Sequence, residues 1–230
     1  MSFSNFVGSR LLPYTNPRVV APPADIVPDG RPNIVVATPM RSGTHVLIDC
    51  LLNNLPAYKR RPLYVDLDSV VRRKNYGLQK QLVGPTGHIL KSHFPITGHA
   101  ETAVPLLDQC GRNGIVVAVR RDRSDVLKSI ERWKPNVRDT TDFGNDYDAF
   151  WAFWEKREPL TIDFKDLFEP KKMAAVLDDI CERVGTTRKA SYVSAPSPND
   201  RKKIYASKVT TRLLGRRAPL VNTTIYTLKA

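Results

Sequence analysis

The stretch from Asn33 to Leu52 constrains the fold more than any other part of the chain. It opens with three β-branched apolar residues, Ile34 to Val36, a run typical of a parallel strand that is covered on both faces. Val46 to Leu52 is apolar and indicates a helix. A strand that turns directly into a helix favours an α/β fold with a parallel sheet.

The turn between this strand and this helix, Thr38 to His45, has two interpretations. The N–H groups at a helix N-terminus carry partial positive charge, so they bind a phosphate well, and Arg41 would add a bidentate contact. Alternatively, the turn only links strand to helix, and Ser42 or Thr44 caps the helix. The turn alone leaves both interpretations open.

The length and composition predict one α/β domain with an arm before it. The chain has 230 residues, of which 41% are hydrophobic and 26% charged, enough to bury a sizeable core. Residues 1 to 32 contain six of the 18 prolines and are predicted to form an extended arm, and residues 33 to 230 form the domain. No internal repeat is present.

The net charge indicates the kind of partner the protein binds, and the cysteines indicate the compartment in which it works. The formal charge of +13 favours a polyanionic partner such as a nucleic acid, an anionic membrane surface or a nucleotide with several phosphates. The three cysteines, Cys50, Cys110 and Cys181, have no zinc spacing and indicate buried free thiols of a reducing compartment. No run of eighteen apolar residues occurs, so we expect a soluble cytoplasmic protein without a membrane span.

Polar residues follow a second buried segment further along the chain. Leu63 to Val65 is predicted as a strand, 68 to 81 as a basic and partly helical stretch, and 88 to 90 as another strand. That last strand ends in Lys91, Ser92 and His93, at the carboxyl edge where open α/β sheets bind ligands. Period-2 alternation puts Lys91 and His93 on one side of the strand.

A third strand with a polar end is the clearest in the chain. A helix over 102 to 110 precedes Gly114 to Val119, and Arg121 follows this strand. The next helix, capped by Asp122 or Ser124, carries Ser129 about 12 Å along its axis, so a folded-back Arg121 could share an anion with that hydroxyl. A surface arginine cluster with an unrelated serine is the alternative.

These three elements occur in the order and context of the cytosolic-type sulfotransferases, which use 3′-phosphoadenosine 5′-phosphosulfate (PAPS). The chain resembles that family over about residues 33 to 185, where 160 to 167 and 173 to 185 also match a strand and a helix of the family. The resemblance implies an α/β fold with three layers, α/β/α, around a central parallel sheet of the P-loop nucleotide-binding type. It also implies a sulfotransferase, with 3′-phosphoadenosine 5′-phosphate (PAP) as product and no metal.

The site residues implied by the resemblance fall into three groups. The family's Pro-Lys-Ser-Gly-Thr loop holds the 5′-phosphosulfate, and the matching residues are Arg41, Ser42, Gly43, Thr44 and His45. The Lys-Thr-His-x-Pro element matches Lys91, Ser92 and His93, with His93 in the place of the general base. The family's Arg and Ser that clasp the 3′-phosphate match Arg121 and Ser129, eight residues apart.

The charges fit sulfuryl transfer in line from a phosphate oxygen to an acceptor oxygen or nitrogen. Negative charge grows on the leaving phosphate, where Arg41, Lys91 and the loop N–H groups would meet it. His93 would take the proton of the acceptor.

Three departures from the family affect recognition of the nucleotide. Val46 stands where the family has the tryptophan that stacks on adenine, and Phe164 stands where it has a tyrosine. The glycine-rich C-terminal loop that also reaches the 3′-phosphate is absent. Arg201 to Lys203, or Arg216 and Arg217, are candidates to replace it, although a solvated basic helix over 199 to 215 is the simpler interpretation.

The sequence leaves two other functions and several classes of acceptor open. A nucleotide kinase or NTPase of related fold lacks its Walker lysine here, and a non-enzymatic module that binds nucleic acid lacks a motif for specific readout. The favoured acceptor is a small alcohol or phenol, with a carbohydrate as the alternative. Candidate lining segments are 64 to 84, a loop over 135 to 148, and Trp151 with Trp154, although the two tryptophans are rather expected in the core. The aromatic Phe94, Phe143, Tyr147 and Phe150 would suit an aromatic or lipid alcohol, and the basic Arg72, Arg73 and Lys74 an anionic sugar.

Overall fold

A computed structural model describes residues 26–60, 62–96, 98–133 and 140–215. It contains a sheet of five strands, all parallel, in the order β2-β3-β1-β4-β5. The strands are β1 (Asn33–Ala37), β2 (Val65–Asp66), β3 (Ile89–Ser92), β4 (Gly114–Arg120) and β5 (Leu160–Asp163). β1 lies in the middle, so the helix that follows it starts at the centre of the sheet.

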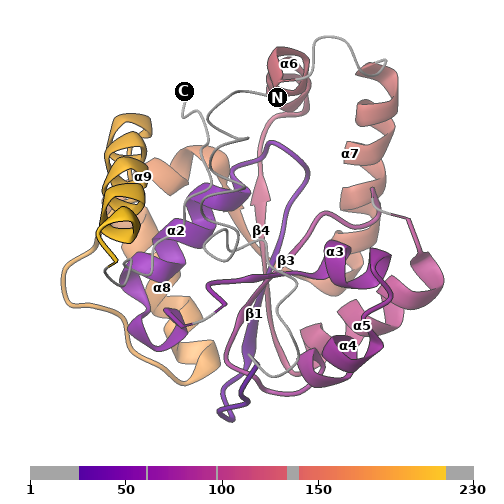
Figure 1. Cartoon of the computed structure of the whole chain (residues 1–230). Helices are drawn as coiled ribbons and strands as arrows, with labels where there is room; N and C mark the ends of the chain where they lie inside the picture. The colour runs from indigo at the N-terminus through magenta and orange to yellow at the C-terminus, as the bar shows by residue number, and fades with distance from the viewer. Residues whose placement is uncertain (1–25, 61, 97, 134–139, 216–230) are drawn as a thin grey trace.

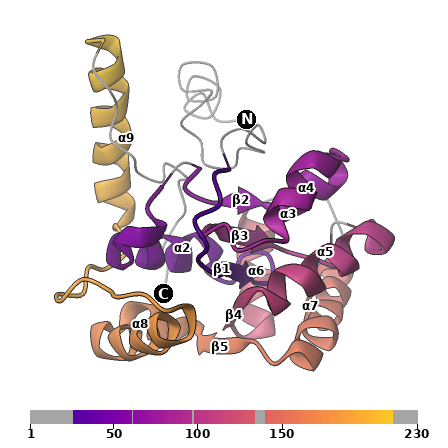
Figure 2. The ribbon, with the colours of Figure 1, turned by 90° about the horizontal axis from the view of Figure 1, so that it is seen from below.

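Helices cover both faces of the sheet, as Figure 2 shows. One face carries α2 (Thr44–Asn54) and α8 (Pro170–Val184), and the other carries α3 (Leu67–Arg72), α4 (Tyr76–Leu82), α5 (Ala100–Arg112) and α7 (Thr140–Trp154). α6 (Arg123–Trp133) follows the carboxyl end of β4 and packs on α7 (Figure 1). The predicted three-layer α/β/α fold is therefore confirmed.

The apolar run of β1 explains why the sheet is covered on both sides. Ile34 and Val36 belong to the core cluster under α2 and α8, while Val35 and Ala37 belong to the cluster under α3, α5 and α7. All four residues are fully buried. Successive side chains of a strand point to opposite faces, so a central parallel strand must be apolar at every position.

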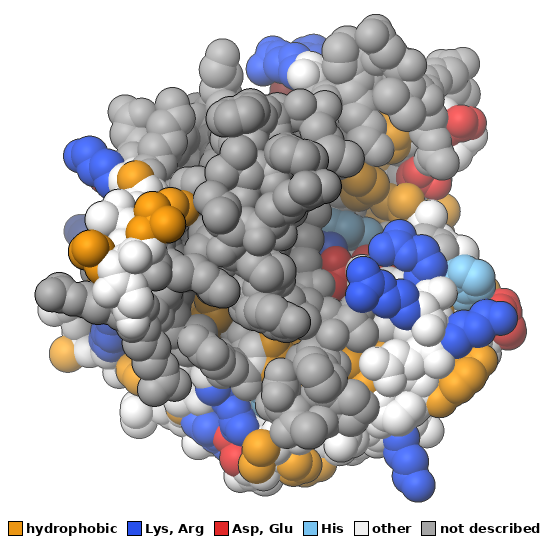
Figure 3. Space-filling view, in the orientation of Figure 1, with side chains coloured by type: hydrophobic (Ala, Val, Ile, Leu, Met, Phe, Trp, Pro, Cys, Tyr) orange, Lys and Arg blue, Asp and Glu red, His pale blue; other side chains and the backbone are white. Residues whose placement is uncertain are grey.

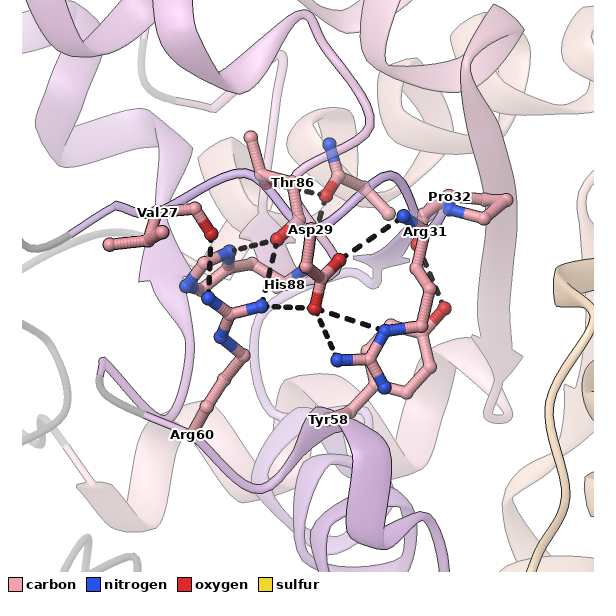
Figure 4. Close-up of polar contacts among 9 residues, drawn as sticks. Val27, Asp29, Arg31, Pro32, Tyr58, Arg60, Thr86 and His88 are labelled. Carbon is pink, nitrogen blue, oxygen red and sulfur yellow. Dashed lines mark hydrogen bonds and ion pairs between the residues drawn. The ribbon is translucent and has the colours of Figure 1, made fainter.

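The chain before β1 is tied down at the amino end of the sheet. The Asp29 carboxylate pairs with both Arg31 and Arg60, and Arg60 also donates to the carbonyl oxygens of Val27 and Thr86 (Figure 4). These residues form the Asp29 cluster: Asp29, Arg31 and Arg60. Residues 1 to 25, most of the expected arm, lie outside the described part of the chain.

Two sequence predictions need correction. The expected strand over Leu63 to Val65 is the two-residue β2, Val65–Asp66, and Leu63 and Tyr64 precede it as buried residues outside the ladder. The expected loop over 135 to 148 is helical from Thr140 onward. Phe143, Phe150 and Trp154 are buried at helical spacing along α7, and burial of this stripe holds the segment as a helix.

Other predictions agree with the structure. Cys50, Cys110 and Cys181 are buried free thiols, and Trp151 and Trp154 are buried. The basic C-terminal segment forms α9 (Pro198–Leu213), which stands away from the sheet in both ribbon views (Figures 1 and 2). Within the described residues, no helix combines the length and the apolar character needed to cross a membrane.

Candidate functional site

The strand order puts a topological switch point at the carboxyl ends of β1 and β4, called the crevice below because open α/β sheets bind their ligands at such a point. After β1 the chain leads to β2 at one edge of the sheet, and after β4 it leads to β5 at the other edge. Neighbouring strands whose connections diverge leave room between their loops, the usual ligand position in an open α/β sheet. The loop 38–43 follows β1 and Arg121 follows β4, so two of the predicted elements meet there.

The loop 38–43, called the β1 loop below, has an unusual backbone. Arg41 has φ 67° and Gly43 has φ 96°, and a residue other than glycine adopts such a positive angle only where the surroundings enforce it. A Cβ on Gly43 would come within 3.0 Å of the Phe164 and Leu167 side chains. The Thr38 and Thr44 hydroxyl oxygens lie 2.5 Å apart and join the two ends of the loop.

Ser42 brings a buried hydroxyl to the start of α2. Its side chain is fully buried, and its Oγ has no hydrogen-bond partner among the described residues. α2 has 11 residues, and the first N–H groups of a helix have no partner within the helix. The alternative in which Ser42 or Thr44 caps α2 is wrong, since Gly43 is the N-cap residue and no side chain caps this helix. An anion at this position would accept from the hydroxyl and from helix N–H groups together.

Two arginines and the predicted serine meet beside the β1 loop. Arg121 Nη1 donates to the carbonyl oxygen of Arg41 over 3.0 Å, and Arg41 Nε donates to Ser129 Oγ over 3.2 Å. Arg41 therefore lies between the two residues that were expected to share an anion. Ser129 accepts in this bond, so its O–H proton remains available for a further acceptor.

The arginines form an electropositive centre. Burial and the nearby Arg121 charge lower the pKa of Arg41. Burial also lowers the pKa of Arg121; the Asp125 charge acts to raise it by less than burial lowers it, and the Arg132 charge lowers it further. Within the described residues no carboxylate forms an ion pair with Arg121, and its buried Nε has no partner. Two cations held together in this way favour an anion between them.

Phe164 lies under this centre. The Arg121 guanidinium sits 4.2 Å from the centre of the Phe164 ring, and Tyr147 Oη donates to the carbonyl oxygen of Arg121 over 2.7 Å. Val46, in the place of the family's tryptophan, is buried in the core. At the two positions where the resemblance predicts a change in adenine recognition, the structure thus has a buried valine and a phenylalanine covered by the Arg121 guanidinium.

His93 is bound to the β1 loop itself. Its Nδ1 lies 2.7 Å from the carbonyl oxygen of Thr38, the first residue of that loop. A carbonyl oxygen only accepts, so Nδ1 carries the proton and the neutral ring has its lone pair on Nε2. This is the tautomer that a general base at Nε2 requires.

Sequence analysis missed two carboxylates at the end of β2. Asp66 pairs with Lys91 across 2.9 Å, as the register Asp66 to Lys91 of β2 and β3 dictates. Asp68 accepts from Ser92 Oγ and from the His93 backbone N–H. The signal was the Asp-Leu-Asp sequence directly after a predicted strand, next to a strand that ends in Lys-Ser-His.

Lys91 is less exposed than its predicted role implied. Its side chain is buried, and its ammonium is held by Asp66. Burial acts to raise the pKa of Asp66, but the Lys91 charge and the hydrogen bonds outweigh it, and the pKa is lowered. The charge of Asp66 therefore compensates part of the charge that Lys91 would offer to a leaving phosphate.

The other histidines lie in different surroundings. His45 is half-buried on the first turn of α2 and faces the Tyr64 ring at 5.8 Å between ring centres. His88 Nδ1 lies 2.8 Å from the Thr86 carbonyl oxygen at the amino end of the sheet (Figure 4). His99 is exposed at the start of α5.

The expected acceptor residues divide into buried rings and exposed cations. Phe94, Phe143 and Phe150 are buried in the core, and only Tyr147 of the four aromatic residues is half-buried. Arg72, Arg73 and Lys74 are exposed, and Figure 3 shows Lys and Arg side chains beside a hollow in which histidine and acidic side chains are visible.

The proposed replacements for the missing C-terminal loop remain predictions. Arg216 and Arg217 lie outside the described residues, and Arg201 and Lys202 lie near the start of α9. Within the described part of the chain no group of His, Cys, Asp and Glu side chains is arranged to hold a metal ion. A scan against models of protein families and a search of curated proteins gave no match to this sequence.

Proposed function

We propose that this protein is a sulfotransferase that moves the sulfuryl group of PAPS to a hydroxyl or amine acceptor, with His93 as general base. One observation carries the proposal: the carbonyl of Thr38 holds the imidazole of His93, and the same loop continues into Arg41 and Ser42. The base and the anion site are thus joined through a few residues of one loop.

The residues fit the cofactor by their chemistry. A fully buried hydroxyl without a partner at Ser42 and two half-buried arginines offer donors to anions, and PAPS carries negative charge at both its 5′ and its 3′ positions. Arg41, Ser42, Gly43, Thr44 and His45 would hold the 5′ end, and Arg121 with Ser129 the 3′-phosphate.

The residues around the crevice supply positioning and charge. PAPS, when bound, supplies the sulfuryl group, and PAP is released. Arg41 and the N–H groups of the β1 loop would stabilise the negative charge that grows on the leaving phosphate. Because the fold already holds these donors in place, they need not reorganise during the reaction, and such stabilisation is usually the largest single contribution to catalysis. His93 Nε2 accepts the proton of the acceptor hydroxyl, while Nδ1–H stays on the Thr38 carbonyl.

A calorimetric titration tests the proposal. We expect PAP to bind in the absence of magnesium, ATP to bind more weakly, and a mixed-sequence oligonucleotide to compete only at low salt. Transfer from radiolabelled PAPS to a panel of alcohols, phenols and carbohydrates then identifies the acceptor class. Magnesium-dependent binding of ATP without binding of PAP would favour a kinase or NTPase, and salt-resistant oligonucleotide binding a nucleic-acid module.

A further inference from the structure

One carboxylate holds the segment that carries His93. Asp68 Oδ1 accepts from Ser92 Oγ over 2.8 Å, and Oδ2 accepts from the backbone N–H of His93 over 2.7 Å. Ser92 Oγ in turn accepts from the backbone N–H of Phe94 over 3.0 Å. Three consecutive residues at the end of β3 are therefore fixed by a side chain from the start of α3.

This carboxylate is kept where charge is costly. Asp68 is only 7% exposed, and burial raises the pKa of its carboxyl to about 6 even though the Lys91 ammonium acts to lower it. An uncharged side chain could hold a backbone N–H without the cost of desolvating a charge. A buried charge at this position therefore calls for an explanation beyond the packing of β2 against β3.

The charges next to His93 are unbalanced. Asp66 and Asp68 contribute two carboxylates from the end of β2 and the start of α3, and Lys91 contributes one ammonium from β3. The charge of His93 acts to lower the pKa of Asp66, so the imidazole lies within electrostatic reach of Asp66, and the backbone of His93 contacts Asp68 directly. On the side of β1, the His93 ring contacts the uncharged Thr38 carbonyl. Two of the three charged side chains at the ends of β2 and β3 are carboxylates, so together these three groups act to stabilise a proton on His93.

We propose that Asp68 is a positioning residue for His93, which fixes the backbone of the base and whose negative charge raises the affinity of the imidazole for the acceptor proton. This inference rests on the proposed function, because it assigns a role within that reaction. It predicts that the charge of Asp68 matters separately from its hydrogen bonds.

The test compares Asp68→Asn, Ser92→Ala and the control Asp108→Asn with wild type. Asp108 is a carboxylate on α5 that pairs with Arg157 far along the chain from the site residues. The measurements are the dissociation constant of PAP, the melting temperature, and the single-turnover rate of sulfuryl transfer between pH 5 and 9.

Asp68→Asn keeps an oxygen for the His93 N–H but removes the charge. We expect the rate at pH 8 to fall about tenfold with the affinity for PAP unchanged within twofold. The acidic limb of the rate profile should move to lower pH by about one unit, because imidazole without the negative neighbour loses its proton more readily. Ser92→Ala should lower the rate about threefold and leave the acidic limb at the wild-type pH. Asp108→Asn should change neither the rate nor the pH of this limb.

Several results would overturn the inference. An unmoved acidic limb in Asp68→Asn, or a rate loss matched by an equal loss of folded protein, would make Asp68 purely structural. If Asp68→Asn does not fold, Asp68→Glu must keep the limb of wild type, and a displaced limb there would refute the role of the charge. Wild-type protein that neither binds PAP nor transfers sulfate would instead refute the proposed function.

Discussion

The arginines at the two ends of the same sheet lie in different surroundings. At the amino end, Asp29 receives both Arg31 and Arg60, so that two cations share one carboxylate (Figure 4). At the carboxyl end, Arg41 and Arg121 lie together, and they donate hydrogen bonds to a hydroxyl and to a carbonyl oxygen. The first arrangement joins opposite charges within the chain, and the second places two like charges side by side, which an added anion would stabilise.

This difference separates stability from binding. Paired charges near a surface stabilise the fold modestly, whereas like charges held together cost stability that a ligand can return. Side chains at the carboxyl end should therefore affect ligand binding and turnover, and those at the amino end should affect only unfolding. The following predictions test that separation, from the largest expected effect to the smallest.

Replacement of His93 should have the largest effect. His93→Ala removes the base that Thr38 orients, so we expect kcat to fall by about two to four powers of ten, the range for loss of a general base. The affinity for PAP should barely change. Single-turnover rates and PAP titrations on the same preparations separate the two quantities.

The remaining histidines serve as matched controls. His45→Ala should first weaken PAP binding, since His45 lies on the first turn of α2 beside the β1 loop. His88→Ala and His99→Ala should leave both the rate and the affinity close to wild type, because these residues lie away from the crevice. Normal turnover of His93→Ala with an alcohol acceptor would contradict the mechanism.

Arg121 should determine selectivity for the 3′-phosphate. Loss of a charge-assisted bidentate contact costs about 1.5 to 3 kcal/mol, so Arg121→Ala should weaken PAP binding roughly ten- to a hundredfold. Adenosine 5′-phosphosulfate, which lacks the 3′-phosphate, should be affected much less. The control is Arg120→Ala, whose guanidinium lies over Trp151 and pairs with Glu155. Equal weakening of both ligands would assign Arg121 to another part of the nucleotide.

Replacement of Ser42 should affect ligand affinity and stability differently. Its hydroxyl is buried without a partner among the described residues, so Ser42→Ala should leave the melting temperature unchanged or raise it. The same change should weaken PAP binding about tenfold if the hydroxyl donates to the anion. Thr161→Ala, which removes an exposed hydroxyl on β5, is the control. A lower melting temperature with unchanged affinity would show that Ser42 serves the fold.

The strands of the sheet and the polar residues at their carboxyl ends could be predicted from the sequence, because both depend on local patterns. The apolar runs of β1, β3 and β4 and the polar residues that follow them are contiguous, and parallel strands bring their carboxyl ends to one edge. Arg41, His93 and Arg121 therefore came to the same region as expected. The helical stripe of α7 was equally local but was interpreted as a loop.

Long-range pairing could not be predicted in the same way. The bond from Arg41 to Ser129 joins residues 88 positions apart, and the pair of Asp66 with Lys91 depends on the register of a two-residue strand. A one-residue shift in that register would move Asp66 to the other face of the sheet. The sequence contains the residues of the Asp66, Asp68 and Lys91 group, but only the folded backbone brings them together.

The Asp29 cluster gives the smallest predicted effect and the opposite signature to Ser42. Asp29→Asn removes the partner of two arginines that remain partly exposed, so water can replace much of the lost interaction. We expect the free energy of unfolding to fall by about 1 kcal/mol, as is usual for such pairs. For a chain of this length that lowers the melting temperature by about 2 to 4 °C. Urea unfolding and PAP titration of the same variant provide the measurement, and PAP affinity should stay at the wild-type value. Weakened PAP binding here would mean that the amino end of the sheet is coupled to the crevice, and the separation of stability from binding would not hold.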